Sequence, residues 1–186
     1  MGVCERRIFA RKCEIREIGS DIGREFIEEY HIQGSNRLGF LFFGLFYLDE
    51  LVGVISLGRH HRQYKVTVLD RLCFKSGISV VGGSSRLFSR CLDWAVENNC
   101  SEIISFSDNR WSLGKVYSAT DFVLEKEYRP DYSYVEVARP EKRISKQSQK
   151  KKVVNCPEYM TEYEWAAERG LARIWDCGKK KWKKVV

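Results

Sequence analysis

The sequence predicts an α+β protein in which helices cover a mixed β-sheet. Three observations support this prediction. Short apolar or alternating runs typical of strands recur along the first 138 residues, and helix-like segments separate some of them. Two neighbouring runs, 39–47 and 51–57, are joined by Leu48-Asp49-Glu50 as in a β-hairpin. Hairpins pair strands antiparallel, whereas helical crossovers pair them parallel, so the sheet should contain both kinds of neighbour.

The expected elements follow in the order β-α-β-β-β-α-β-α-β-β. Alternating apolar and charged residues predict a first strand over 11–18. Ser20 and Asp21 can cap a helix over 22–30, which ends before Gly34. After the hairpin we expect strands at 66–74, 103–106, 121–124 and 132–137, a strand–glycine turn–helix unit from 80 to 96, and short helices at 112–119 and 161–169. The strand at 132–137 is expected to close the sheet.

The charge is divided unevenly along the chain. In total, 32 Lys and Arg stand against 25 Asp and Glu, a net charge of +7. Residues 1–138 hold 18 basic and 19 acidic residues (−1), whereas residues 139–186 hold 14 basic and 6 acidic residues (+8). We therefore predict a catalytic domain over 1–138 and a basic C-terminal extension over 139–186, which begins with a flexible linker over 139–152. The extension should pack on the domain and contact DNA; a merely solvated tail is the alternative.

Other protein classes are disfavoured by the composition. The longest apolar run, 38–48, is too short to span a bilayer, so no membrane contact is predicted. The opening residues 1–7 lack the apolar core of a secretory signal. The seven cysteines show no paired spacing and are expected to be reduced thiols of a cytoplasmic protein. Neither cysteines nor histidines show a zinc-binding spacing, so we predict no metal site.

A glycine turn is the candidate donor site. It lies between an expected strand and an expected helix, where backbone N–H groups and the helix dipole attract anions. Serine hydroxyls add further donors and an arginine adds charge. The turn consists of Gly82, Gly83, Ser84, Ser85 and Arg86. A plain tight turn is the alternative.

Polar residues directly after the expected strand 103–106 form a second candidate site. Asp108 could hydrogen-bond or deprotonate an amine, and Trp111 could stack on an extruded base. Arg110 could hold a phosphate or a carboxylate with two parallel hydrogen bonds. The alternatives are a helix cap or arginine partner for Asp108 and core packing for Trp111.

Four further residues are candidates for chemistry. His31 could act as a general base, or it could simply close a helix end. Tyr117 could protonate a leaving group or orient a donor, or it could be a packed tyrosine. Asp70 and Arg71 stand within an apolar strand and form either a substrate-binding pair or an internal ion pair.

Clustered lysines interleaved with an aromatic residue predict contacts with phosphates and bases in the C-terminal quarter. These residues are Lys150, Lys151, Lys152, Lys179, Lys180, Lys181 and Trp182.

The order of elements and two motifs resemble the GNAT acyltransferase superfamily. In that superfamily a strand–turn–helix binds the pyrophosphate of the acyl donor, and a Tyr-x-x-x-Gly-Phe segment lies near the thioester. The turn at Gly82–Arg86 and Tyr117-Ser-Ala-Thr-Asp-Phe122 occupy these places. The resemblance implies a GNAT-like fold and an acyl donor, acetyl-CoA or another activated acyl group. Asp121 stands where glycine is usual, and Ser79 stands where Arg or Gln is usual.

A closer resemblance covers most of the chain. Six segments are similar to a group of phage proteins that resembles the Mom-type DNA-modification enzymes and also occurs with homing-endonuclease-type modules. The segments are Ala10-Arg-Lys-Cys13, Tyr30-His-Ile-Gln-Gly34, Gly44-Leu-Phe-Tyr47, Val81-Gly-Gly-Ser84, Asp108-Asn-Arg-Trp-Ser112 and Arg173-Ile-Trp-Asp-Cys-Gly178. The resemblance implies an enzyme that adds a carbamoylmethyl-like group to the exocyclic N6 of adenine in double-stranded DNA, in the cytoplasm of a host cell. The alternatives are a non-catalytic DNA-binding accessory module and a CoA-dependent N-acetyltransferase.

Overall fold

A computed structural model describes residues 4–36 and 38–186, so the first three residues of the opening segment lie outside the described part of the chain. The chain forms two compact units. The first contains the described residues up to Ser107, then Ser112–Lys126 and Lys180–Val186; the second contains Asp108–Trp111 and Glu127–Lys179. No helix in the described residues is long and apolar enough to cross a membrane.

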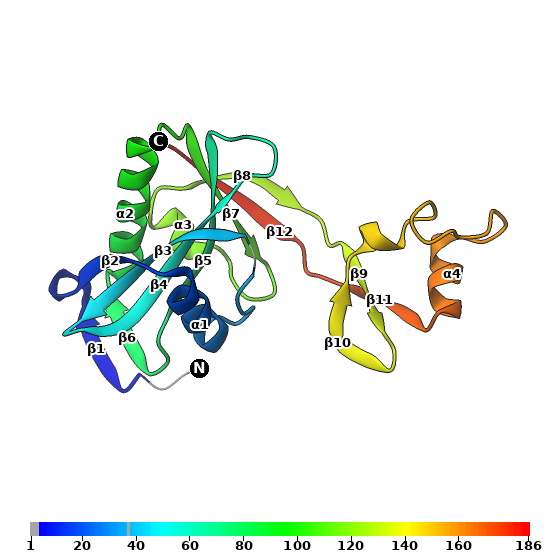
Figure 1. Cartoon of the computed structure of the whole chain (residues 1–186), viewed down its shortest axis with the longest axis horizontal. Helices are drawn as coiled ribbons and strands as arrows, with labels where there is room; N and C mark the ends of the chain where they lie inside the picture. The colour runs from blue at the N-terminus through cyan, green and yellow to red at the C-terminus, as the bar shows by residue number, and fades with distance from the viewer. Residues whose placement is uncertain (1–3, 37) are drawn as a thin grey trace. The chain divides into compact units, whose positions relative to one another are not determined.

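The first unit is built on a seven-stranded mixed sheet (Figure 1). Its strands, in spatial order, are β2 (Glu14–Ile18), β3 (Gly39–Tyr47), β4 (Glu50–Arg59), β5 (Val66–Phe74), β7 (Glu102–Asp108), β12 (Lys179–Val185) and β8 (Val123–Tyr128). The pairs β2–β3, β3–β4 and β4–β5 are antiparallel, whereas β5–β7 is parallel. The predicted α+β class and the predicted mixture of hairpins and crossovers are therefore confirmed.

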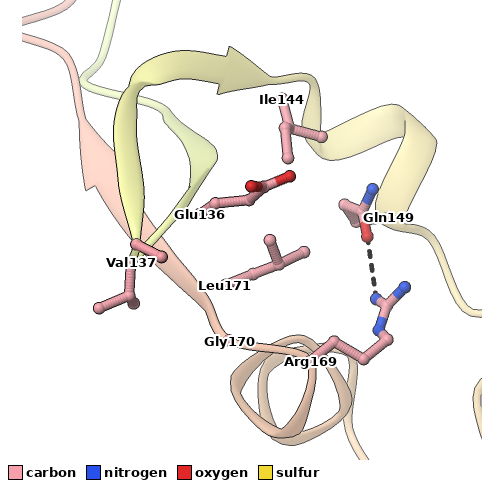
Figure 2. A pocket seen from close by; sticks show the side chains of 8 residues that line it. Glu136, Val137, Ile144, Gln149, Arg169, Gly170 and Leu171 are labelled. Carbon is pink, nitrogen blue, oxygen red and sulfur yellow. Dashed lines mark hydrogen bonds between the residues drawn. The ribbon is translucent and has the colours of Figure 1, made fainter.

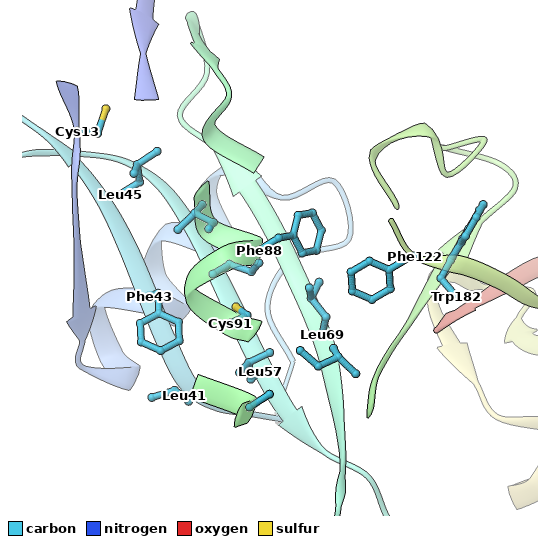
Figure 3. Close-up of a cluster of buried hydrophobic side chains, with 14 of the residues drawn as sticks. Cys13, Leu41, Phe43, Leu45, Leu57, Leu69, Phe88, Cys91, Phe122 and Trp182 are labelled. Atoms are coloured by element: carbon cyan, nitrogen blue, oxygen red, sulfur yellow. The ribbon is translucent and has the colours of Figure 1, made fainter. Parts of the chain in front are cut away.

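Two helices cover opposite faces of this sheet. Helix α1 (Ser20–Tyr30) packs Phe26 and Ile27 against Phe42, whereas α2 (Gly83–Glu97) packs Leu87, Phe88 and Cys91 among the side chains of the opposite face. Successive residues of a strand point to opposite faces, so β3 contributes Phe42 to one cluster and Phe43 to the other. Figure 3 shows the larger cluster, which extends from Cys13 to Trp182.

The small elements of the first unit complete its connections. Strand β1 (Arg6–Phe9), which the sequence did not predict, pairs in parallel with β6 (Ile78–Val81), and a 3₁₀ turn (Ala10–Lys12) leads from β1 towards β2. The hairpin turn between β3 and β4 places Leu48 and Asp49 at positive φ, as two-residue hairpin turns of the primed type require. Helix α3 (Lys115–Ser118) is shorter than the predicted helix over 112–119.

The C-terminal residues correct the predicted domain boundary at 138. They form β12, which lies between β7 and β8 in the main sheet, rather than an extension. Trp182 anchors this strand in the sheet, because its side chain is buried in the larger cluster. The second unit is consequently an insertion between β8 and β12. The first unit carries 20 basic and 15 acidic residues (+5) and the second carries 12 and 10 (+2), so the division into −1 and +8 does not follow the structure.

The second unit has its own antiparallel sheet. Its strands, in spatial order, are β10 (Arg139–Ile144), β9 (Tyr132–Glu136) and β11 (Leu171–Trp175). The strand predicted at 132–137 thus belongs to this sheet rather than to the main one. A flexible linker over 139–152 was also wrongly predicted, because β10 and a 3₁₀ turn (Lys146–Gln149) occupy most of it. Helix α4 (Glu162–Glu168) begins with a capping box between Thr161 and Glu164, at the predicted place.

Candidate functional site

The parallel strands β5 and β7 separate within the first unit. Their pairing runs from Val66 and Glu102 to Leu69 and Ser105, and both strands continue beyond that last pair. Helix α2 connects them as a crossover. Ligands in sheets of this kind bind at the carboxyl ends of parallel strands where neighbouring strands diverge. We call the place where β5 and β7 are no longer paired, beyond Leu69 and Ser105, the opening.

Two hydroxyl groups mark the point where the strands diverge. Ser105 is buried, and its Oγ donates a hydrogen bond to the Leu69 carbonyl at 2.8 Å. The Oγ of Ser105 also lies 2.8 Å from the Tyr117 hydroxyl, which can donate to it. Burial is the largest influence on the pKa of Tyr117 and raises it above the ordinary value of a phenol. Tyr117 is therefore a protonated hydroxyl at the opening, as its predicted role requires.

Asp70 and Arg71 begin the part of β5 that is no longer paired with β7, although it remains paired with β4. The Asp70 carboxylate accepts hydrogen bonds from Asn36 Nδ2 at 2.7 Å and from Ser56 Oγ at 3.4 Å. Arg71 Nη1 lies 3.4 Å from Asp70 Oδ1, and Arg71 Nε donates to the Gly34 carbonyl at 3.1 Å. The two side chains are only 6% and 18% exposed. Both are therefore fixed by the protein, and both predicted interpretations, an ion pair and a site pair, fit this geometry.

His31 ends helix α1 beside this pair. Its backbone N–H donates to the Ile27 carbonyl, which is the helix-end role that the sequence left open. Burial lowers the pKa of the His31 ring, the Arg71 charge lowers it further, and Asp70 opposes the change. The ring Nδ1 accepts the Gln33 N–H at 3.1 Å, so the neutral ring carries its proton on Nε2. In this arrangement His31 offers a hydrogen-bond donor, and its role as general base stays a prediction.

Aromatic neighbours hold Tyr117 in place, and their contacts with it could not be predicted from the sequence. Its ring stacks on Trp182, and Phe88 and Phe122 pack at its edges with centroids 6.2 Å and 5.7 Å away. Trp182 is buried and its Nε1 donates to Ser107 Oγ at 2.9 Å. Trp182 is thus not available to stack on a base, contrary to the prediction. Its contact with the site could be found only from the sheet order.

The glycine turn opens α2 as predicted. Gly82 is the N-cap residue with φ +77°, a conformation that glycine adopts without strain. It supplies no capping side chain, so the first N–H groups of the 15-residue helix remain available, and the first turn holds no acidic residue. A Cβ on Gly83 would lie 2.6 Å from the Phe74 ring, which explains the second glycine. Arg86 Nη1 donates to the Ala10 carbonyl at 2.6 Å, and this bond fixes its charge near the turn.

The second unit contains the predicted Asp108–Trp111 segment. Asp108 accepts hydrogen bonds from the backbone and guanidinium N–H groups of Arg110, the closest side-chain bond being 2.9 Å. Burial alone would raise the pKa of Asp108, but Arg110 and Lys179 together outweigh it and lower the pKa. The alternative interpretation as an arginine partner is therefore the one observed, and a lowered pKa makes a weak base. Trp111 is 54% exposed, which excludes core packing.

The predicted lysine contacts differ between the two units. In the second unit Lys150, Lys151 and Lys152 are exposed, with no side-chain hydrogen bond or ion pair within the described residues. Most of the other predicted lysines are paired. Lys179 lies 3.4 Å from Asp176 and Lys181 lies 2.7 Å from Glu125, each within its own unit. Lys180 also has an interaction partner. The lysine-rich strand β12 is consequently not a free basic tail.

A pocket of about 560 Å³ lies in the second unit and includes none of the predicted site residues (Figure 2). Gln149 Oε1 accepts a hydrogen bond from Arg169 Nη2 at 2.9 Å at its edge, and the chain around Gly170 forms one wall. The lining residues are Glu136, Val137, Ala138, Ile144, Gln149, Arg169, Gly170 and Leu171. Within the described residues no three His, Cys, Asp or Glu side chains converge as metal ligands would.

The sheet order, the crossover helix and the opening between β5 and β7 define the fold of the GNAT acetyltransferases. A Bacillus subtilis acetyltransferase in complex with CoA has a TM-score of 0.54 at 12% identity, over 94% of this chain and 98% of that chain. A Vibrio cholerae spermidine/spermine N-acetyltransferase has a TM-score of 0.56 at 12% identity, over 95% and 94%. A GNAT family acetyltransferase from Elizabethkingia anophelis with acetyl-CoA bound has a TM-score of 0.52 at 14% identity, over 94% and 99%.

The sequence itself matches the Mom protein family over residues 12–169. Because the match extends over most of the chain, the chain belongs to the Mom protein family, as the resemblance predicted. No curated protein matches the sequence.

Proposed function

We propose that this protein is a DNA-modifying acyltransferase that transfers an acyl-derived, carbamoylmethyl-like group to the exocyclic N6 of adenine. The observation that carries the proposal is the hydroxyl of the half-buried Tyr117, which lies at hydrogen-bond distance from Ser105 where β5 and β7 separate. Membership of the Mom family supports DNA as the acceptor, and the GNAT fold supports an activated acyl group as the donor.

The donor would be acetyl-CoA or another activated acyl group. Its pyrophosphate would bind the free N–H groups at the start of α2, where the dipole of a 15-residue helix and the charge of Arg86 favour an anion. Two of the similar acetyltransferases named above hold CoA or acetyl-CoA, which supports this class of donor. When bound, the donor supplies an acyl carbon attached to a good leaving group.

Tyr117 would act as the general acid. The amine nitrogen would attack the carbon of the group that is transferred, the bond between that carbon and its leaving group would break, and Tyr117 would give its proton to the departing atom. The proton released by the amine then restores the phenol, so the step balances. Burial raises the pKa of Tyr117 and thereby keeps the proton in place until the leaving group needs it.

Arg71 and His31 would orient the reacting groups. Arg71 is fixed by Gly34 and by Asp70, so its remaining N–H groups can hold the acyl oxygen or an anionic part of the donor. Because the His31 pKa is lowered, the ring is neutral at pH 7 and its Nε2–H can donate to the base. Within the second unit, the exposed Trp111 offers a separate ring surface on which a base can stack.

Nucleoside mass spectrometry tests the proposal. DNA from cells that express the chain is digested and compared with DNA from cells that express the Tyr117→Phe variant. We expect a modified deoxyadenosine only with the unchanged chain. Unmodified DNA from cells shown to contain the folded protein would contradict the proposal. If an acyl donor raises the unfolding temperature of the protein but no modified nucleoside forms, the protein would be an N-acetyltransferase of other amines. If the protein binds DNA but no donor, it would be an accessory module.

A further inference from the structure

The three-stranded sheet of the second unit presents aromatic and cationic side chains on one face. In the register of β9 and β11, Tyr132 lies opposite Trp175 and Tyr134 lies opposite Arg173. Alternate residues of a strand point to the same face, and directly opposite residues share a face. These four side chains therefore lie together, although the sequence separates them into two segments.

Ring contacts connect these side chains into a row. The Arg173 guanidinium lies 4.9 Å from the ring centroid of Tyr163 and 4.3 Å from that of Tyr132. The centroids of Tyr132 and Trp175 lie 5.3 Å apart. We call Tyr163, Arg173, Tyr132 and Trp175 the aromatic row. Tyr134 is buried beneath it and accepts a hydrogen bond from Arg173 Nε at 3.3 Å.

The two ends of the aromatic row are open. Trp175 is 58% exposed and Tyr163 is 55% exposed, which is unusual for aromatic side chains that already pack in a cluster. The row therefore has free ring surface at which a further planar group can stack.

Positive charge surrounds the row. Lys146 lies 5.5 Å from the Tyr132 ring centroid, and Lys151 donates its backbone N–H to Glu162, the neighbour of Tyr163 in the chain. With Lys150, Lys152, Arg173 and Lys179, six cations stand in these segments against four carboxylates. The carboxylates are Asp131, Glu162, Glu164 and Asp176, of which Asp131 pairs with Lys146 and Asp176 with Lys179. A ligand that stacks on this row meets a net positive field.

We propose that the aromatic row binds unpaired nucleotides of a DNA strand, with bases stacked on Trp175 and Tyr163 and phosphates on Lys150–Lys152. Exposed rings beside a cationic track are the combination that binds single strands, because every unpaired base offers a π-face. A duplex hides those faces within its own stack. The inference rests on the proposed function for its choice of DNA, and it adds the single-stranded class to the predicted duplex partner.

Fluorescence anisotropy on the full chain tests this proposal without any acyl donor. The probe is a labelled oligonucleotide of about 12 nucleotides, used alone and annealed to its complement. We expect Trp175→Ala to weaken binding of the single strand by about tenfold and to leave duplex binding nearly unchanged. Tyr159→Ala, which removes an exposed ring outside the row, is the matched control and should change neither affinity.

A second variant distinguishes a loss of stacking from a loss of folding. Trp175→Phe keeps a ring for stacking, so we expect it to retain single-strand affinity while the quenching of tryptophan fluorescence by the oligonucleotide decreases. Equal losses for single strand and duplex in Trp175→Ala, or undiminished quenching in Trp175→Phe, would overturn the proposal. Because these measurements involve binding alone, their failure is distinguishable from the absence of a modified nucleoside.

Discussion

The ring of Tyr117 stacks on the ring of Trp182, with centroids 5.4 Å apart and planes 16° from parallel. Each of these side chains also bonds to a serine of β7, Tyr117 to Ser105 and Trp182 to Ser107. The two serines are alternate residues and point to the same side of the strand. The C-terminal strand is therefore part of the structure that positions the hydroxyl group of the candidate site.

Replacing Trp182 by alanine should destabilise the first unit strongly. The indole is buried, and its removal leaves a cavity beside Tyr117 and an unpaired Ser107. We expect the free energy of unfolding to fall by about 3–5 kcal/mol, measured by urea denaturation. Trp175→Ala, at an exposed tryptophan, is the control and should cost under about 1 kcal/mol. Similar losses for the two variants would show that Trp182 is not part of the core.

Gly114 should be intolerant of any side chain. It has φ +78°, and a Cβ at this position would lie 2.7 Å from Cε2 of Trp182 and closer still to another ring atom. Gly114→Ala therefore combines backbone strain with displacement of the indole, and we expect a loss of more than about 2 kcal/mol. Gly170→Ala is the matched control, because it has φ +71° and no atom within 4 Å of its added Cβ. The midpoint temperature of thermal unfolding should fall clearly more in Gly114→Ala than in Gly170→Ala.

Tyr117→Phe should separate catalysis from stability. The variant loses one hydroxyl group, while Ser105 keeps its bond to the Leu69 carbonyl. The free energy of unfolding should therefore change by less than about 1.5 kcal/mol. If Tyr117 is the general acid, the rate of nucleoside modification should fall by about 100-fold or more. A variant with normal stability and an unchanged rate would exclude this role.

Local patterns in the sequence predicted most elements of the first unit up to β7, although not β1. The strand over 66–74 was predicted at its observed bounds, and the glycine turn was predicted to open a helix, because hydrophobic periodicity and turn residues are local signals. Asp121, which replaces the usual glycine of the family segment, has φ +58°. A positive φ explains the family preference, and aspartate is among the few other residues that tolerate it.

The location of β12 could not be predicted in the same way. Its five lysines indicate a solvated tail when they are read locally, yet the strand belongs between β7 and β8. Its lysines form ion pairs with carboxylates of neighbouring segments, as Lys183 does with Glu102 at 2.5 Å. These partners, like the contact of Trp182 with Tyr117, are set by tertiary structure rather than by sequence spacing. For the same reason the pairing of Tyr132 with Trp175 became visible only in the register of β9 and β11.

The stability of the protein should decrease in mildly acidic solution because of His31. Its pKa in the folded state is lowered, chiefly by burial, so the unfolded chain takes up a proton on this ring at a higher pH than the folded chain does. The folded state therefore loses relative stability as the pH falls below the ordinary histidine value of about 6.5. Urea denaturation between pH 7 and pH 5 should show a smaller decrease in His31→Gln. His61→Gln, at an exposed histidine, should leave the decrease in place.

Salt dependence should identify which lysines contact DNA. Lys150, Lys151 and Lys152 are exposed in the second unit, whereas Lys181 and Lys183 form ion pairs in the first. Each phosphate contact adds about 0.9 to the slope of log K against log salt concentration for duplex DNA. Replacing the three exposed lysines by glutamine should therefore reduce the slope by about 2 to 3. The double variant Lys181→Gln and Lys183→Gln should keep the slope. If instead the slope follows the double variant, β12 carries the DNA contacts, as the charge pattern alone predicted.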